Sequence, residues 1–135
     1  MAMFIERLIN QGNAPLLEQT VRFHAARHRL LAENIANAST PGYRQQDLSV
    51  DKFRQMLRDR VDAKRVAPPG TVSFDDVGAE VEQPARGLLF HDGNNRSMEQ
   101  LMSDSAKNAM FHNMMVEMLR KQFDSIESAL RERIA

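Results

Sequence analysis

The residues that break helices are distributed very unevenly along this chain of 135 residues. All five prolines and all six glycines lie between Gly12 and Gly93, and none falls within residues 16–40 or 94–135. Proline and glycine in a helix interior cost about 3 and about 1 kcal/mol relative to alanine. The pattern therefore predicts a mainly α fold, in which two long terminal helices flank a small irregular or β-containing middle segment.

The first uninterrupted stretch carries an apolar row with coiled-coil spacing. Steps of four and three residues alternate along the row, as expected for a helix that packs along a second helix. We predict a helix over residues 16–38, with Asn13 as its N-cap and Pro15 in its first turn. The members of the row are Leu17, Val21, His24, His28, Leu31, Ile35 and Ala38.

The second stretch opens with a capping box, Ser97-Met-Glu-Gln100, and predicts a helix from Met98 to about Ile134. A helix of this length cannot bury its whole apolar stripe against one partner of 23 residues. The surplus stripe, with six of the nine methionines between Met98 and Met118, predicts contacts with other molecules. Its predicted packing positions are Leu101, Met115, Leu119, Phe123 and Ile126.

The middle segment gives weaker signals. Val50–Leu57 predicts one or two helical turns, and Thr71–Phe74 and Leu88–Phe90 hint at short strands. The prolines and glycines between them favour loops. The predicted organisation has three segments: residues 1–43, 44–96 and 97–135.

Composition argues against several functions. The chain has 18 basic and 18 acidic residues, so it lacks the basic excess of a nucleic-acid binder. It has no cysteine and no Gly-x-Gly pair, which leaves neither a thiolate site nor a phosphate-binding glycine loop. His24 and His28 lie one turn apart, as two metal ligands do. We favour seam or surface histidines, and we predict no catalytic residue, metal, cofactor or small-molecule substrate.

The run Leu31-Ala-Glu-Asn-Ile-Ala-Asn-Ala-Ser-Thr-Pro-Gly-Tyr43 resembles the N-terminal signature of flagellar rod and hook proteins. Asp47 and the segment Asp92-Gly-Asn-Asn95 before the second helix are similar to the proximal-rod branch of that family. Pro41-Gly42 also suits the centre of a type II turn. The resemblance marks an assembly motif made of Asn34, Ile35, Ala36, Asn37, Thr40, Pro41, Gly42 and Tyr43.

The resemblance implies a structural subunit of the bacterial flagellar basal-body rod, with terminal helices that pair in the inner layer of a helical tube. It implies self-contacts, contacts with other rod proteins, and contacts with a FliE-type adaptor and the MS-ring end. It also implies a periplasmic location, reached through the type III export gate without a cleaved signal peptide. Phe4 and Leu8 resemble an export-recognition segment, but we favour a simple helix face as the explanation of these two residues.

Three alternatives stay open at this stage. Asn34 and Asn37 either form hydrogen bonds across the helix pair or, in the case of Asn37, simply end the first helix. The methionines between Met98 and Met118 either contact non-identical neighbouring subunits or fill an ordinary core. As a whole, the chain is either a rod subunit or a soluble helical adaptor or chaperone that binds partner helices.

Overall fold

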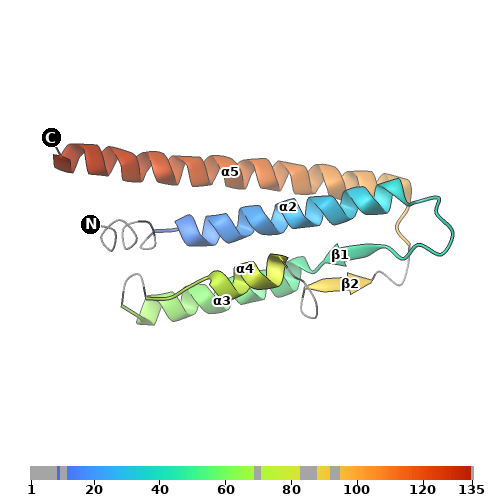
Figure 1. Cartoon of the computed structure of the whole chain (residues 1–135), viewed down its shortest axis with the longest axis horizontal. Helices are drawn as coiled ribbons and strands as arrows, with labels where there is room; N and C mark the ends of the chain where they lie inside the picture. The colour runs from blue at the N-terminus through green and yellow to red at the C-terminus, as the bar shows by residue number, and fades with distance from the viewer. Residues whose placement is uncertain (1–8, 10–11, 69–70, 83–87, 92–94, 135) are drawn as a thin grey trace.

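The structure is a computed structural model, and it describes residues 9, 12–68, 71–82, 88–91 and 95–134. Figure 1 shows three layers, with one long helix above, another in the middle, and two shorter helices below. The elements are α2 (Ala14–Ala36), β1 (Gln46–Leu48), α3 (Val50–Val66), α4 (Asp75–Glu82), β2 (Leu89–His91) and α5 (Met98–Ile134).

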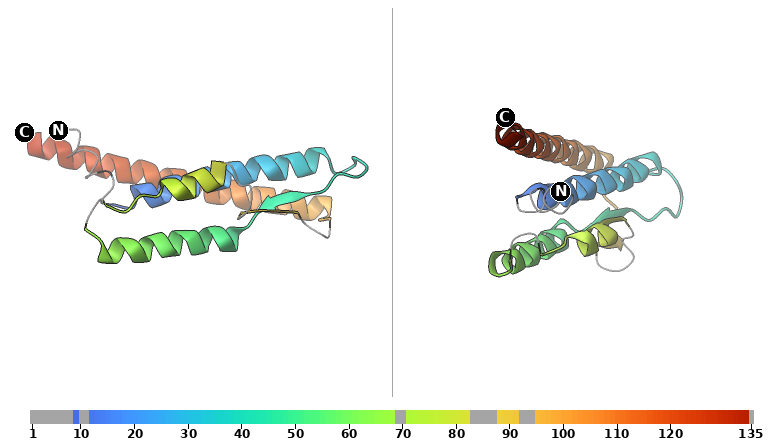
Figure 2. Two further views of the ribbon diagram at one scale, coloured as in Figure 1. Left: turned by 60° about the horizontal axis from the view of Figure 1, so that its bottom comes forward. Right: turned by 60° about the vertical axis from the view of Figure 1, so that its left-hand side comes forward.

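The two long terminal helices, α2 and α5, run antiparallel side by side (Figures 1 and 2). The predicted mainly α fold is confirmed. At a rise of about 1.5 Å per residue, α5 is about 55 Å long and α2 about 34 Å. Asn13 stands at the N-cap of α2 but makes no side-chain cap bond there. The Ser97 cap is present, because Ser97 Oγ accepts a hydrogen bond from the Gln100 backbone N–H at 3.2 Å.

The middle segment is more helical than predicted. The one or two expected turns after Val50 are a helix of 17 residues, α3. Ser49 Oγ caps it by accepting a hydrogen bond from the Lys52 backbone N–H. The acidic Asp51 lies in the first turn and the basic Lys64 in the last turn, where each charge interacts favourably with the helix dipole. No expectation covered α4, and the strand expected at residues 71–74 is irregular backbone followed by α4.

The sheet is a single antiparallel pair, β1 with β2, in which Asp47 faces Phe90. The strand expected at residues 88–90 is therefore confirmed to within one residue, as β2. Its partner β1 follows the Thr-Pro-Gly-Tyr turn and was not expected, because three residues are too short a run for an alternation pattern to be visible.

Among the described residues, a cluster of buried apolar side chains lies between α2 and the middle segment. Phe23 of α2 stacks on Phe53 of α3, with ring centroids 4.0 Å apart and an interplanar angle of 7°. Arg60 of α3 forms an ion pair with Asp76 of α4. The middle segment is thus a packed third layer on α2. The buried members of the cluster are Phe23, Leu48, Phe53, Val77, Val81 and Leu88.

Candidate assembly site

The turn after α2 has the geometry that its sequence predicts. The Tyr43 backbone N–H donates to Thr40 O at 3.2 Å, and Gly42 has a φ of 76°. A positive φ at the third position is the mark of a type II turn and suits glycine. Among the described residues, no residue other than glycine has a positive φ.

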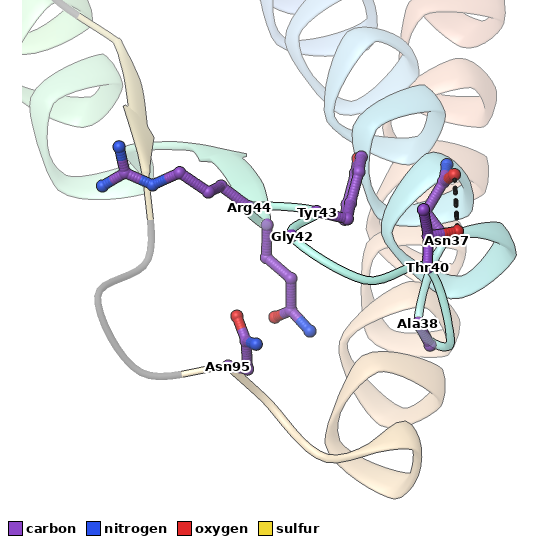
Figure 3. A pocket seen from close by; sticks show the side chains of 8 residues that line it. Asn37, Ala38, Thr40, Gly42, Tyr43, Arg44 and Asn95 are labelled. Atoms are coloured by element: carbon purple, nitrogen blue, oxygen red, sulfur yellow. Dashed lines mark hydrogen bonds between the residues drawn. The ribbon is translucent and has the colours of Figure 1, made fainter.

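Asn37 ends α2, as one of the two alternatives proposed. Its Nδ2 donates to Glu33 O at 2.9 Å, which satisfies a carbonyl in the last turn of the helix. Thr40 Oγ1 donates to Asn37 Oδ1 at 3.3 Å, the bond drawn in Figure 3. Asn37 is therefore a local terminator of the helix.

Asn34 fastens the strand after the turn to α2, rather than bonding across to α5. Its Nδ2 donates to Gln46 O at 2.7 Å, and its Oδ1 accepts from Gln46 N–H at 3.1 Å. The Tyr43 hydroxyl donates to the same oxygen at 3.2 Å. Burial, and then the charge of Glu33, raise the pKa of Tyr43 above its ordinary value, so the hydroxyl keeps the proton that this bond needs.

Gln45 makes a second fastening of the same kind, to the residues before α5. Its Nε2 donates to Arg96 O at 3.2 Å, and its Oε1 accepts from Arg96 N–H at 2.9 Å. Between the turn and this connection lies a polar hollow of about 300 Å³, lined among others by Thr40, Arg44 and Asn95 (Figure 3). Of the remaining motif residues, Pro41 and Ala36 are exposed and Ile35 is half-buried.

Asp47 is the electrostatic centre of this end of the molecule. Its side chain is 3% exposed and binds Arg27 of α2, at 2.9 Å from Nε to Oδ1 and 3.2 Å from Nη2 to Oδ2. Arg96, just before α5, reaches Asp47 Oδ2 at 2.8 Å and Asp104 of α5 at 3.2 Å. One buried carboxylate therefore ties α2, β1 and the start of α5 together, in the forked geometry that arginine favours.

A second buried polar contact joins the terminal helices directly. The Asn108 side chain of α5 donates to the His24 backbone oxygen at 2.7 Å, and its Oδ1 accepts from His24 Nδ1 at 2.8 Å. The His24 ring also stacks on Phe111, with centroids 5.8 Å apart. Burial lowers the pKa of His24, and the charges of Arg27, His112 and Arg54 lower it further against the raising effect of the Asn108 bond.

The two histidines weighed as metal ligands have different surroundings. His24 is buried and bonded to Asn108, whereas His28 is exposed. In the described part of the chain, no group of three histidine, aspartate or glutamate side chains stands close enough to hold a metal ion. Nor is any described helix both long and apolar enough to cross a membrane.

The predicted packing residues differ in how deeply the helix pair buries them. Leu17, Leu31 and Leu101 are buried, and Val21, Met115, Leu119 and Ile126 are half-buried, whereas Phe123 is 44% exposed. Because the helices are antiparallel, heptad steps from the His24–Asn108 pair place Leu31 level with Leu101, and Leu17 level with Met115. Along α5, burial therefore decreases from Leu101 and Asn108 toward the C-terminus, whereas α2 stays buried at both Leu31 and Leu17.

A row of large apolar side chains, each about half exposed or more, runs along α5. Phe111 lies at the edge of this row toward α2, where its ring stacks on His24. Met110 is 72% exposed, Phe111 46%, Met114 48% and Met118 46%. Steps of four residues keep the three methionines on one face of the helix. We call these four residues the methionine stripe. An apolar row that is contiguous and exposed marks a candidate interaction surface.

The sequence-based search missed several residues of this site. Arg27 and Arg96 gave no signal, because a charged residue is usually a solvated one. The alternating helical pattern does show that Asn108 lies seven residues after Leu101, on the buried face. Phe4 and Leu8, the predicted export-recognition pair, lie outside the described residues, as do residues 92–94 of the second family segment.

Comparison with known proteins finds relatives named flagellar basal body rod protein FlgB. The Salmonella typhimurium protein is 29% identical over 123 residues, which cover 84% of this chain and 89% of the relative. The Escherichia coli protein is 25% identical over the same shares. The Bacillus subtilis protein is 24% identical over 121 residues, covering 88% of this chain and 93% of the relative.

No protein-family model matches the chain, and no solved structure matches it. The relatives support a flagellar rod protein family. They match over most of their own length, so the likeness includes the middle segment as well as the terminal helices.

Proposed function

We propose that this chain is a structural subunit of the flagellar basal-body rod, of the FlgB type, which assembles helically through α2 and α5 as part of the drive shaft. The observation that carries the proposal is the exposed apolar surface of α5, on a chain whose relatives are rod proteins. A single chain leaves the methionine stripe and the last turns of α5 in water, and neighbouring subunits would remove both from it.

The turn end of the helix pair supports the same role through its hydrogen bonds within the chain. Three polar side chains of the motif form hydrogen bonds within the chain. Asn34 bonds to Gln46 of β1 and to Tyr43, and Asn37 bonds to the last turn of α2. We therefore propose that the motif serves assembly indirectly. It fixes the angle at which the middle segment leaves the helix pair, so that every subunit presents the same surfaces to its neighbours.

The finer parts of the proposal follow from the family type. The chain would contact copies of itself, other rod proteins, a FliE-type adaptor and the MS-ring end. It would reach the periplasm through the type III export gate, without cleavage of a signal peptide. Subunits of a tube join through two different patches that do not close on themselves, and the contrast between the two ends of this molecule suits such a contact.

The decisive experiment is complementation in the flagellated host of this chain. After deletion of its gene, we expect no swimming and no completed rods, and the restored full chain should co-purify with basal bodies. The alternative, a soluble adaptor or chaperone that binds partner helices, predicts that the chain stays in the soluble fraction. Intact basal bodies that lack the chain would contradict the proposed function.

A further inference from the structure

All the sulfur in this chain is thioether sulfur, and part of it is exposed along one face of α5. The chain contains nine methionines and neither cysteine nor tryptophan. Met110, Met114 and Met118, the three methionines of the methionine stripe, are 72%, 48% and 46% exposed. In a chain without thiols, exposed thioethers are the side chains that a mild oxidant attacks first.

Other methionines of the chain provide an internal contrast with the stripe. Met115 follows the stripe residue Met114 directly but is half-buried, and Met56 of α3 is partly buried against the apolar cluster. Met98 and Met102 are 42% and 56% exposed, but they lie in the first two turns of α5, outside the stripe. Exposure therefore distinguishes the stripe from Met115 and Met56, and position distinguishes it from Met98 and Met102.

We propose that the methionine stripe is an oxidation site that controls the docking of this chain, with a small peroxide as the oxidant. The thioether sulfur attacks one peroxide oxygen, so that an S–O bond forms as the O–O bond breaks. The hydrogen of the transferred oxygen passes to the other oxygen, which leaves as water. Sulfur loses two electrons and the peroxide gains them. The product is methionine sulfoxide, which a methionine sulfoxide reductase returns to the thioether.

The sulfoxides change the surface of α5 and leave its fold in place. A sulfoxide oxygen accepts hydrogen bonds from water on an exposed helix face, and it loses them when an apolar neighbour covers it. Three such groups along one face convert an apolar row into a polar one. The inference rests on the proposed function at this step, since the docking that it blocks is assembly into the rod. A docked subunit is protected in turn, because its neighbour excludes the oxidant.

The first test concerns the site and uses the purified full chain. After brief exposure to dilute hydrogen peroxide, peptide mass spectrometry gives the rate of oxygen uptake at each methionine. We expect Met110, Met114 and Met118 to react several-fold faster than Met115 and Met56, with the circular dichroism spectrum and the urea midpoint unchanged. Equal rates at the five positions, or loss of helix as the stripe reacts, would overturn the inference.

The second test concerns docking and uses leucine, an apolar residue that peroxide does not oxidise. The flagellated host carries the wild-type chain, the stripe variant Met110→Leu with Met114→Leu and Met118→Leu, or the control variant Met98→Leu with Met102→Leu. All three strains receive the same peroxide pulse while rods are being built. We expect the amount of chain retained in purified basal bodies to fall several-fold for the wild type and the control variant and to hold for the stripe variant.

The location of the sulfoxides completes the test. In the wild type, they should accumulate in the unassembled chain and be scarce in the chain recovered from basal bodies. Equal oxidation of the two pools, or equal loss of the wild type and the stripe variant from basal bodies that contain the chain, would reject only the inference. Absence of the chain from basal bodies grown without peroxide would reject the proposed function, and the docking step with it.

Discussion

The two ends of the helix pair differ in how completely the chain satisfies them. At the turn end, Asn34, Gln45 and Asp47 are buried, and hydrogen bonds or ion pairs within the chain engage each of them. At the far end, Phe123 is 44% exposed and Ile134 85%. The turn end thus stabilises the single chain, whereas the far end offers apolar surface whose burial requires another molecule. Mutations at the turn end should therefore mainly lower the stability of the single chain. Mutations of the exposed apolar residues of α5 should mainly weaken assembly.

The largest expected effect on stability is at Asp47. Removal of its carboxylate by Asp47→Ala leaves Arg27 and Arg96 partly buried, each less than one-fifth exposed, without their shared partner. We expect a loss of about 3 kcal/mol in the free energy of unfolding, measured by urea denaturation followed by circular dichroism. Asp62→Ala, which breaks an exposed pair, serves as the control and should change little. A loss at Asp47 as small as that of the control would show that its ion pairs with Arg27 and Arg96 do not stabilise the chain.

A smaller effect is expected at the turn itself. Gly42→Ala places a side chain at a φ of 76°, where nothing within 4 Å obstructs its Cβ. The cost is then conformational alone, about 1 kcal/mol in the same urea assay. Thr40→Ala keeps the backbone and loses only an exposed bond, so it should cost less. An equal loss in the two variants would mean that the glycine conformation has no special importance.

The contact between the helices predicts a dependence on pH. Burial lowers the pKa of His24 below its ordinary value of 6.5, so the unfolded chain binds the proton more readily than the folded chain does. The stabilising contribution of neutral His24 should be fully present above pH 6.5. It should be lost as the pH falls through the lowered folded pKa.

The measurement is the free energy of unfolding as a function of pH, in the wild type and two variants. His24→Gln should flatten the slope below pH 6.5, whereas the exposed His28→Gln should leave it unchanged. A slope that survives in His24→Gln would assign the effect to other groups.

The smallest effect on stability, and a large one on assembly, is expected in the methionine stripe. Met110, Met114 and Met118 are about half or more exposed, so changing all three to serine should alter the free energy of unfolding by about 0.5 kcal/mol or less per site. Retention of the chain in purified basal bodies should nevertheless fall.

The control for this variant is a triple serine variant of Asn113, Glu117 and Arg120, which are exposed polar or charged residues in the same part of α5. It should leave retention unchanged. Equal retention of both variants would remove the stripe from the assembly surface. A large loss of stability in the methionine variant would instead show that the stripe belongs to the core of the single chain.

The sequence alone determined the terminal helices and the turn, because local physics dictates both. Uninterrupted helix formers, the Ser97 cap and the Pro41-Gly42 pair act over a few residues and leave visible patterns. The middle segment was underestimated for the same reason. Its α4 is only eight residues long, and a helix of that length is held by packing on α2 rather than by its own propensity.

Only the tertiary structure decided which polar residues matter. Arg27, Asp47, Arg96 and Asn108 come from four separate places in the chain, and their value depends on burial and on partners that the sequence does not reveal. The structure also placed a cluster of buried apolar side chains between α2 and the middle segment. The length and the apolar spacing of α5 predicted more apolar surface than α2 is able to cover. Where that surplus lies follows from the shorter length of α2 and from the register that the His24–Asn108 contact sets.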